Sequence, residues 1–395
     1  MSDVVNFEFV APARIVFGSG HFERLGELAG KIGRRALIVF NGSEPIANLA
    51  KGQLSSSGLD AELFRQRGEP TVNDVDSATE IARNEQVDLV VGLGGGSAID
   101  AAKAVAALVA NGGSALDYME VVGKGQRLAR ASIPWIAIPT TFGTGAEATK
   151  NAVIGAPARG FKASIRGEQL LAKIVLVDPA LGRGVPSKVI AQSGMDAVCQ
   201  LIESYTSNGA GPMTDGLATA GLKRAPSALR RAYLNGQDLD ALTDMALAAL
   251  LSGICLANAG LGAVHGFAAP LGANFPIPHG AVCAALLPYV VRANVAALRA
   301  ASKDHPILRR YADIGRAAGA GAGESDAGAI EFLIQFLFDL SRDLHIQPLG
   351  AFGVEDKEVD RIVALARKAS SMRFNPIVLD DTVLASVLRD AIAGA

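Results

Sequence analysis

The sequence predicts an α/β domain with a parallel sheet, followed by an all-helical domain. Three observations lead to this fold class. The chain has 395 residues, more than one hydrophobic core usually serves. Short β-branched runs alternate with helical stretches up to about residue 180, which is typical of a parallel sheet covered on both faces. Beyond that point, apolar residues recur with the helical period of about 3.6 residues. We therefore expect one domain at 1–185 and a second at 186–395, with 184–187 as a linker that caps the next helix.

Six apolar runs are the predicted strands of the first domain: Ala13–Phe17, Ala36–Phe40, Ala61–Phe64, Asp88–Gly92, Pro134–Pro139 and Ile174–Asp178. Amphipathic helices are expected between several of them, for example at Asp74–Asn84 and Ala98–Ala110. A ligand of such a sheet binds beyond the carboxyl ends of its strands. The residues that follow each strand are therefore the first candidates for a binding site.

The composition limits the classes of function. The formal net charge is −2, with 50% hydrophobic and 19% charged residues. Such a chain is not expected to bind nucleic acid or an anionic membrane surface. Its longest apolar runs are too short to span a bilayer, and its first residues lack the pattern of a secretory signal. We expect a cytoplasmic protein that acts on a small molecule.

The three cysteines, Cys199, Cys255 and Cys283, are widely spaced and odd in number. A disulfide framework is therefore not expected, and the spacing does not match the cysteine pairs of a zinc site.

A cluster of glycines follows the fourth predicted strand, at Gly94, Gly95 and Gly96, and leads through Ser97 into a helix. Glycine lets a ligand approach the main chain closely, and the N–H groups at a helix start attract a phosphate. A plain strand-to-helix turn capped by Ser97 is the simpler interpretation, but it does not need three consecutive glycines. The pattern favours binding of a pyrophosphate, although it is not a standard G-x-G-x-x-G motif.

Two further strand ends extend the predicted dinucleotide site. Thr140, Thr141 and Thr144 follow the fifth strand and offer hydroxyl groups as a second wall. The segment Asn41–Ser43 follows the second strand and lacks the acid that usually binds the ribose of NAD. Asn41, Gly42 and Ser43 leave room and donors for a 2′-phosphate. NADP(H) is therefore favoured over NAD(H), although Asn can also bind a ribose and Asn-Gly is a common turn.

Two of the five histidines, His265 and His279, lie in an apolar stretch rich in glycine and proline. An imidazole in such surroundings needs a partner, because an unpaired buried polar group is costly. That partner is either another group of the protein or a divalent metal. The first helix of the second domain carries Asp196, Gln200 and Glu203 on one face. Asp196 either complements a helix dipole or completes a metal site with the two histidines, with Gln200 as an optional ligand.

Four motifs together resemble the iron-containing (group III) alcohol dehydrogenase family: Gly94–Asp100, Pro139–Gly145, Gly194–Ala197, and His265 with His279 fourteen residues later. Their order and separations match over nearly the whole chain. The resemblance implies a dinucleotide domain and a helical domain of the dehydroquinate synthase-like architecture, with metal and nicotinamide meeting in the cleft between them. It also implies three metal ligands, Asp196, His265 and His279. Fe²⁺ is the expected metal and Zn²⁺ is the second choice.

The residues predicted to bind the coenzyme are Asn41, Gly42, Ser43, Gly94, Gly95, Gly96, Ser97, Asp100, Thr140, Thr141, Thr144 and Lys162. Lys162 is included because the family often has a lysine near the nicotinamide ribose.

The chain departs from the family at two positions. Gln200 stands where the family has a second ligand, a histidine, and Ala269 stands where a further histidine takes part in proton relay. An amide is a weaker donor than imidazole toward Fe²⁺ or Zn²⁺. Three outcomes stay open: weaker metal binding, another ion, or a site with three ligands. Coenzyme ribose hydroxyls and water are the remaining candidates for moving the proton.

We expect reversible hydride transfer between NAD(P)H and a small aldehyde or ketone, with the metal as Lewis acid. One alternative is a maleylacetate reductase-like enzyme with a carboxylate-bearing substrate. The stretch Gly253–Val291 has no basic residue, which disfavours that alternative, whereas Lys162 and Arg166 keep it open. Another alternative is a dinucleotide-binding protein whose metal chemistry has decayed. A homodimer is a further possibility, formed through the β-prone segment Val5–Val10.

Overall fold

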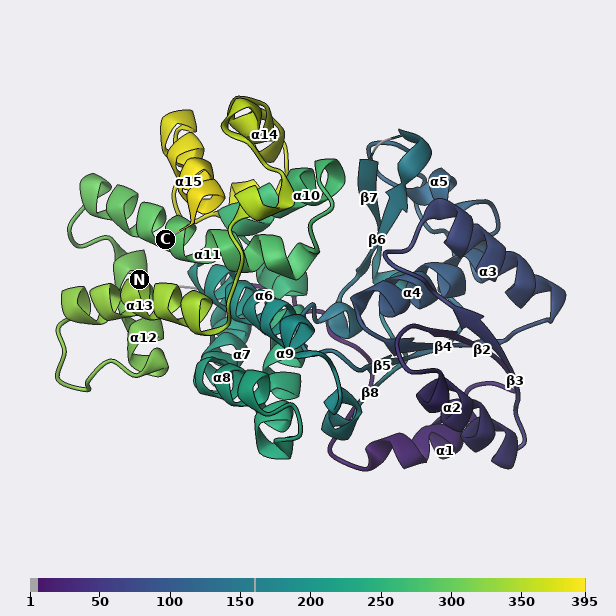
Figure 1. Ribbon diagram of the computed structural model, residues 1–395. Coiled ribbons are helices and arrows are strands. Elements are labelled where there is room, and N and C mark those ends of the chain that lie inside the picture. The colour runs from purple at the N-terminus through teal and green to yellow at the C-terminus, as the bar shows by residue number, and fades with distance from the viewer. Residues whose placement is uncertain (1–5, 160, 395) are drawn as a thin grey trace. The chain divides into compact units, whose positions relative to one another are not determined.

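The computed structural model describes residues 6–159 and 161–394 of the chain, which form two compact units (Figure 1). One unit spans 11–183, and the other comprises 184–394 together with the segment 6–10. The change of unit thus falls between Arg183 and Gly184, close to the expected limit between 185 and 186. The short N-terminal segment belongs with the helical unit because Val10 exchanges two main-chain hydrogen bonds with the Asn258 side chain, of 2.7 and 2.8 Å.

The first unit is built on a six-stranded parallel sheet in the order β1-β8-β5-β4-β2-β3. Its strands are β1 (Ile15–Phe17), β2 (Arg35–Phe40), β3 (Asp60–Arg65), β4 (Leu89–Gly94), β5 (Trp135–Pro139) and β8 (Ile174–Val177). All six predicted strands are confirmed, with ends that differ by one or two residues. The parallel sheet and the helical second half confirm the predicted fold class.

Five α-helices accompany these strands: α1 (Leu25–Ala29), α2 (Glu44–Ser56), α3 (Val72–Asn84), α4 (Gly96–Asn111) and α5 (Ala115–Tyr118). Helices α3 and α4 both begin two residues before the predicted starts. Thr71 caps α3 with its side chain, which accepts a hydrogen bond from the Asp74 N–H. The cap residue of α4 is Gly95, so the capping role considered for Ser97 is wrong.

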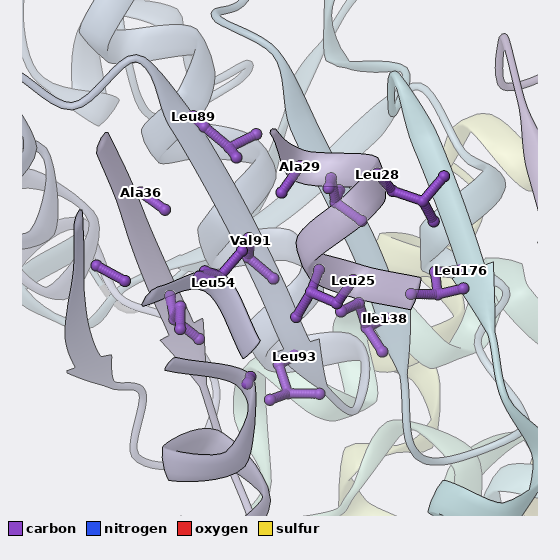
Figure 2. Packing of buried hydrophobic residues seen from close by; sticks show 14 of the residues in the cluster. Leu25, Leu28, Ala29, Ala36, Leu54, Leu89, Val91, Leu93, Ile138 and Leu176 are labelled. Atoms are coloured by element: carbon purple, nitrogen blue, oxygen red, sulfur yellow. The ribbon is translucent and has the colours of Figure 1, made fainter. Parts of the chain in front are cut away.

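One face of the sheet forms a hydrophobic core with α1 and α2 (Figure 2). Leu89, Val91 and Leu93 alternate along β4 and point to this side, where they meet Leu25 and Leu54 of the two helices. Each leucine buried in this way stabilises the fold by about 2 kcal/mol. Every second residue of the central strand is therefore committed to packing. This fixes the strand register and hence the position of the strand end that follows.

A two-stranded antiparallel hairpin, β6 (Asn151–Ala156) with β7 (Phe161–Arg166), was not predicted. Both strands contain small residues, such as Gly155 in β6 and Ala163 in β7, that give no clear pattern in the sequence. Short 3₁₀ helices complete the two units: His21–Arg24, Ala146–Ala148, Pro157–Arg159, Glu168–Leu170, Pro179–Gly182, Leu349–Phe352, Asp356–Glu358 and Ser370–Phe374.

The second unit consists of ten α-helices among the described residues, without a strand. They are α6 (Ser187–Thr206), α7 (Pro212–Leu222), α8 (Ala225–Leu234), α9 (Leu239–Ala259), α10 (Ala263–Asn274), α11 (His279–Ala301), α12 (Pro306–Ala318), α13 (Asp326–Asp343), α14 (Val359–Ala366) and α15 (Asp381–Ala393). Helix α6 is central and packs against α7, α8, α9 and α11 (Figure 1).

Helices α6 and α11 approach each other closely at Gly280. A methyl group built on this glycine would lie 2.4 Å from the Gln192 carbonyl oxygen of α6. The close approach brings the first turn of α11, with His279, beside Asp196 of α6.

Because α6 runs from Ser187 to Thr206, Asp196 lies in the interior of a long helix. Its interpretation as a residue that complements a helix start is wrong.

The expected cap within 184–187 is also wrong. Pro186 precedes α6 and, within the described chain, supplies no side-chain hydrogen bond, while Ser187 is already helical. The proposed strand at Val5–Val10 begins outside the described residues, and its described part, 6–10, forms no strand.

Helices α9 and α11 are long and apolar enough to span a membrane by length and composition alone. Most of each apolar window is nevertheless buried inside the structure, at 67% and 78%. Such burial is typical of core helices of a soluble protein.

Candidate metal centre and coenzyme cradle

Three helices of the second unit bring together four side chains of the types that can bind a metal. Asp196 comes from α6, His265 from the first turn of α10, and His279 and Cys283 from the first turns of α11. One ligand atom from each lies within 4.8 Å of the others. We call these four residues the donor cluster. The structure thus places Asp196 beside both predicted histidines and adds a cysteine that sequence reasoning had not assigned to the site.

The distances within the donor cluster are short. The Asp196 Oδ1 atom lies 3.3 Å from His265 Nε2 and 3.7 Å from His279 Nε2. The Cys283 Sγ atom lies 3.6 Å from His265 Nε2 and 3.7 Å from His279 Nε2. Asp196 is completely buried, whereas the His279 side chain is 44% exposed. The cluster is therefore anchored in the core and can be reached from one side.

Glu203 holds the His265 ring from behind. Its Oε2 atom is 2.6 Å from His265 Nδ1, and its Oε1 atom accepts a 2.7 Å hydrogen bond from the Val264 N–H. With the proton on Nδ1, the Nε2 lone pair faces Asp196 and Cys283. A carboxylate behind a histidine ligand is a common way to fix its tautomer and orientation. Glu203 had been noted on the face of Asp196, but its role was not predicted.

The start of α10 is shaped around Glu203. The Ala263 N–H donates to Asn375 Oδ1 at 3.1 Å, next to the bond between Val264 and Glu203. A methyl group on Gly262 would lie 2.8 Å from Glu203 Oε1 and 2.9 Å from Asn375 Oδ1. Only glycine leaves both oxygens room to hold the helix, and the helix in turn positions His265.

Gln200, the predicted optional ligand, is buried on α6 and engaged with α9. Its Oε1 atom accepts a 2.8 Å hydrogen bond from the Ser252 hydroxyl. The amide oxygen, which is the atom a metal would need, therefore already has a protein partner. Ala269, at the position of the missing relay histidine, is exposed on α10.

The charges in the donor cluster favour a cation. Burial raises the pKa of Asp196. Burial also opposes ionisation of Cys283, but the hydrogen bond from Cys199 and the neighbouring imidazoles outweigh it and hold the pKa of this thiol well below its usual range. The Cys283 charge in turn raises the pKa of His279 to about 9.

Asp196 Oδ2 is buried and has no hydrogen-bond partner within the described ranges 6–159 and 161–394. An unpaired carboxylate oxygen in the core is expensive, and a bound divalent ion would remove that cost. The oxygen, nitrogen and sulfur donors therefore fit a metal.

In the first unit, the ends of β2, β4 and β5 form what we call the glycine cradle: Asn41, Gly94–Ser97 and Thr140–Thr144. These strands are neighbours in the sheet, and the Thr140 N–H donates to the Gly94 carbonyl at 2.9 Å. The Gly95 N–H donates to Asn41 Oδ1 at 2.9 Å. The three predicted strand ends therefore meet at one edge.

Asn41 packs so closely on the turn that a side chain at Gly94 would not fit. A methyl group there would lie 2.0 Å from Asn41 Oδ1, and Gly94 has a φ of +146°, which favours glycine. A methyl group on Gly95 would lie 3.0 Å from Thr141 Oγ1, and one on Gly96 would lie 2.9 Å from Thr144 Oγ1. Beyond the turn, the first N–H groups of α4 lack intrahelical partners, as at any helix start. The cradle can therefore offer main-chain donors to a phosphate.

Other predicted coenzyme residues have structural contacts of their own. Asp100 forms an ion pair with Lys103 at 3.3 Å and accepts a 3.1 Å hydrogen bond from the Val153 N–H. Lys162 forms an ion pair with Glu69. Gly42 and Ser43 lie between β2 and α2, where Ser43 is the cap residue of α2.

Lys103 is a buried residue that sequence reasoning missed. Its Nζ atom donates to the Ala146 carbonyl at 2.8 Å, to Thr149 Oγ1 at 2.9 Å and to the Asn151 carbonyl at 2.6 Å. It thereby ties α4 to the loop that follows the cradle threonines. Its place in an apolar helix next to Asp100 was the only signal in the sequence.

Two family models match the chain: "Iron-containing alcohol dehydrogenase" over residues 12–179 and "Fe-containing alcohol dehydrogenase family, C-terminal" over residues 190–392. The chain is 32% identical to long-chain-alcohol dehydrogenase 1 of Geobacillus thermodenitrificans, over 97% of each chain. The chain belongs to the iron-containing alcohol dehydrogenase family.

Further relatives agree with this membership. The NAD-dependent methanol dehydrogenase of Bacillus methanolicus is 30% identical, over 98% of this chain and 100% of its own. The solved structure of an alcohol dehydrogenase from Oenococcus oeni superposes with a TM-score of 0.90 at 28% identity, over 98% of this chain and 100% of that chain. The resemblance read from the motifs is confirmed, and the chain is an oxidoreductase of the alcohol dehydrogenase type.

Proposed function

We propose that the chain catalyses reversible hydride transfer between NAD(P)H and a small uncharged aldehyde or ketone, with a divalent metal held by Asp196, His265 and His279. The observation that carries this proposal is the buried Asp196 carboxylate. Its Oδ2 atom has no hydrogen-bond partner among the described residues, and its Oδ1 atom lies 3.3 Å from His265 Nε2 and 3.7 Å from His279 Nε2. When bound, the metal supplies a Lewis acid for the substrate oxygen.

The chain's own residues supply orientation. Glu203 holds the proton on His265 Nδ1 and so leaves Nε2 free to bind. His279, with its half-exposed ring, marks the accessible side of the cluster. The glycine cradle binds the pyrophosphate through main-chain N–H groups, while Thr140, Thr141 and Thr144 line the coenzyme. With Ala269 in place of the relay histidine, ribose hydroxyls and water carry the proton.

We propose NADP(H) as the preferred coenzyme. Asn41 replaces the acid expected for NAD, and its oxygen is committed to the Gly95 N–H. Arg65 at the end of β3 lies over the Phe40 ring at 5.6 Å and donates to the Gly42 carbonyl at 3.4 Å. A guanidinium near this strand end suits a 2′-phosphate. The Arg65 guanidinium also forms an ion pair with Glu44 at 2.8 Å. A larger kcat/KM with NADPH than with NADH, reduced by Arg65→Ala, supports the choice. An advantage for NADH refutes it.

An uncharged substrate fits the charges better than a carboxylate. Lys162 and Arg166 are the basic residues that kept the maleylacetate reductase-like alternative open, and each is paired with an acid, Glu69 and Glu120 respectively. The names of the two relatives above indicate alcohols of very different length, a long-chain alcohol and methanol. The chain length of the substrate is therefore the first variable to test.

The test is a panel of primary alcohols and aldehydes, with NADH and NADPH compared, alongside metal analysis of the purified protein. His279→Ala should lose turnover while it keeps coenzyme affinity. Turnover only with maleylacetate or 3-keto acids would support the carboxylate alternative, and absence of both metal and turnover would support a dinucleotide-binding protein without chemistry.

We also propose a cytoplasmic enzyme that binds neither membrane nor nucleic acid and that forms a homodimer. The near-neutral net charge of −2 supports the first statement. Sedimentation of the purified protein tests the homodimer, and a monomer at micromolar concentration contradicts it.

A further inference from the structure

Cys283 occupies a place in the donor cluster that the proposed ligand set does not use. Its sulfur lies 3.6 and 3.7 Å from the two imidazole Nε2 atoms, against 3.3 and 3.7 Å for Asp196 Oδ1. It stands four residues after His279, one turn further along α11. Residues with this spacing share one face of a helix. Both side chains are therefore presented to the same point from a single rigid element.

The separations in the cluster match the edges of a tetrahedron around a zinc ion. Zinc bond lengths give edges of about 3.4 Å between oxygen and nitrogen and about 3.6 Å between nitrogen and sulfur. The observed separations are 3.3 and 3.7 Å from Asp196 Oδ1 to the imidazoles. Those from Cys283 Sγ are 3.6 and 3.7 Å. Four of the six edges therefore agree with a zinc tetrahedron, and the other two are no longer than 4.8 Å.

We propose that Cys283, rather than Gln200, is the fourth protein ligand, and that the resulting oxygen–nitrogen–sulfur site takes Zn²⁺ in preference to Fe²⁺. This inference rests on the metal site of the proposed function. It reverses the order of metals that the family resemblance implies.

The chemistry of the two candidate ligands supports this choice. A thiolate is a soft, charged donor that favours zinc, whereas a neutral amide is weak toward divalent metals. The Gln200 oxygen accepts the Ser252 hydroxyl and so belongs to the packing of α6 on α9. Asp196 and a Cys283 thiolate together also balance the two charges of the ion. The His279 side, 44% exposed, leaves access for a substrate oxygen as a fifth ligand.

Cobalt substitution tests the ligand directly, because a cysteine bound to Co²⁺ gives a thiolate-to-metal charge-transfer band in the near ultraviolet. The full-length protein is stripped of metal and titrated with Co²⁺. We expect the band in the wild type, its loss in Cys283→Ser, and its retention in Gln200→Ala. The visible cobalt bands should remain in Cys283→Ser, which separates loss of the ligand from loss of the site.

Two matched variants serve as controls. Cys255→Ser changes a buried thiol that contacts the Thr214 carbonyl, away from the cluster, and should keep the band. Cys199→Ser changes a thiol that lies 3.9 Å from His265 Nδ1 and also hydrogen-bonds Cys283; because serine can still donate that hydrogen bond, the band should be kept. Coenzyme binding by each variant verifies that the protein remains folded.

Metal selectivity is the second measurement. Under anaerobic equilibration with equal Zn²⁺ and Fe²⁺, the wild type should bind at least about ten times more zinc, and Cys283→Ser should show a smaller zinc-to-iron ratio because the soft donor is removed. A stoichiometric Co²⁺ complex without the charge-transfer band, or a band that survives in Cys283→Ser, overturns the inference while the metal site stands. Failure to bind any of the three metals instead overturns the proposed function.

Discussion

The glycine cradle and the donor cluster differ in the groups that they offer to a ligand: the cradle offers main-chain groups, and the cluster offers side chains. The cradle lies at the ends of neighbouring strands, and its shape comes from the main chain, as in the bond from the Gly95 N–H to Asn41. The donor cluster joins three helices, and its chemistry lies in four side chains. The cradle should therefore be sensitive to added bulk, and the cluster to any change of donor atom.

The supporting residues differ in the same manner. Around the cradle, the apolar residues of β4 fix the strand register and thereby the position of the turn Gly94–Ser97 that follows the strand. Around the cluster, polar residues do the positioning: Glu203 holds His265, and Asn375 holds the start of α10. A buried polar network is sensitive to the loss of a single partner. The two regions should thus fail separately, and each of the following variants tests that separation.

The largest effect is expected for Asp196→Asn. Because the amide cannot replace a buried anionic ligand, turnover should fall by at least about 1,000-fold, the equivalent of several kcal/mol of Lewis-acid stabilisation. Coenzyme affinity should stay within about twofold, since coenzyme binding is assigned to the cradle. Metal content, kcat and coenzyme Kd are measured. Asp244→Asn, at a surface ion pair with Arg224, is the control. Equal loss of coenzyme binding would show that the two regions do not act separately.

Gly94→Ala should produce the converse result. The new methyl group would lie 2.0 Å from Asn41 Oδ1, on a residue with a φ of +146°. Backbone strain and the displaced hydrogen bond cost about 2 to 3 kcal/mol together, so coenzyme affinity should fall roughly 100-fold. Metal content should not change. Gly52→Ala, in α2 with open space around it, is the matched control. Loss of metal from Gly94→Ala would contradict the expectation.

Glu203→Gln tests whether the cluster depends on the carboxylate behind His265. A carboxamide can accept only with its oxygen, so it cannot serve both the His265 ring and the Val264 N–H as the carboxylate does. Metal affinity should drop about 10- to 100-fold. Excess metal should restore kcat with an unchanged KM, because Glu203 positions a ligand and does not bind the metal itself. Glu331→Gln, on the surface of α13, is the control. A kcat that stays low at saturating metal would give Glu203 a different role.

The sequence predicted the glycine cradle better than the donor cluster, because the cradle depends on local patterns and the cluster on contacts between distant residues. Strands such as Leu89–Gly94 follow from a short continuous apolar run, and a glycine turn is visible within a few residues. Asp196, His265 and His279 could be named only because a resemblance connects residues far apart in the chain. Cys283 was missed because cysteine spacing was compared with cysteine pairs, although its spacing of one helical turn from His279 was available. The hydrogen bond between Gln200 and Ser252 depends on the packing of α6 on α9, which no local pattern contains.

The smallest effect on function is expected for Glu147→Gln, which probes the buried polar group behind the cradle. Burial raises the pKa of Glu147 to about 7, against the pull of Lys103. Below about pH 4.5 the carboxyl is protonated in both the folded and the unfolded state. As the pH rises toward 7, the unfolded state loses its proton first, and the wild type loses stability. Glutamine does not titrate, so the variant should gain up to about 3 kcal/mol over the wild type at pH 8 and nothing near pH 4.

The measurement uses the single tryptophan, Trp135, which is buried in β5 and reports denaturation of the first unit. Glu62→Gln, on an exposed position of β3, should show no such pH dependence. A constant stability difference between Glu147→Gln and the wild type from pH 4 to pH 8 would mean that folding does not change the pKa of Glu147. The attraction of Lys103 and the backbone hydrogen bond would then offset the cost of burying Glu147, and polar groups would support this region as they support the donor cluster.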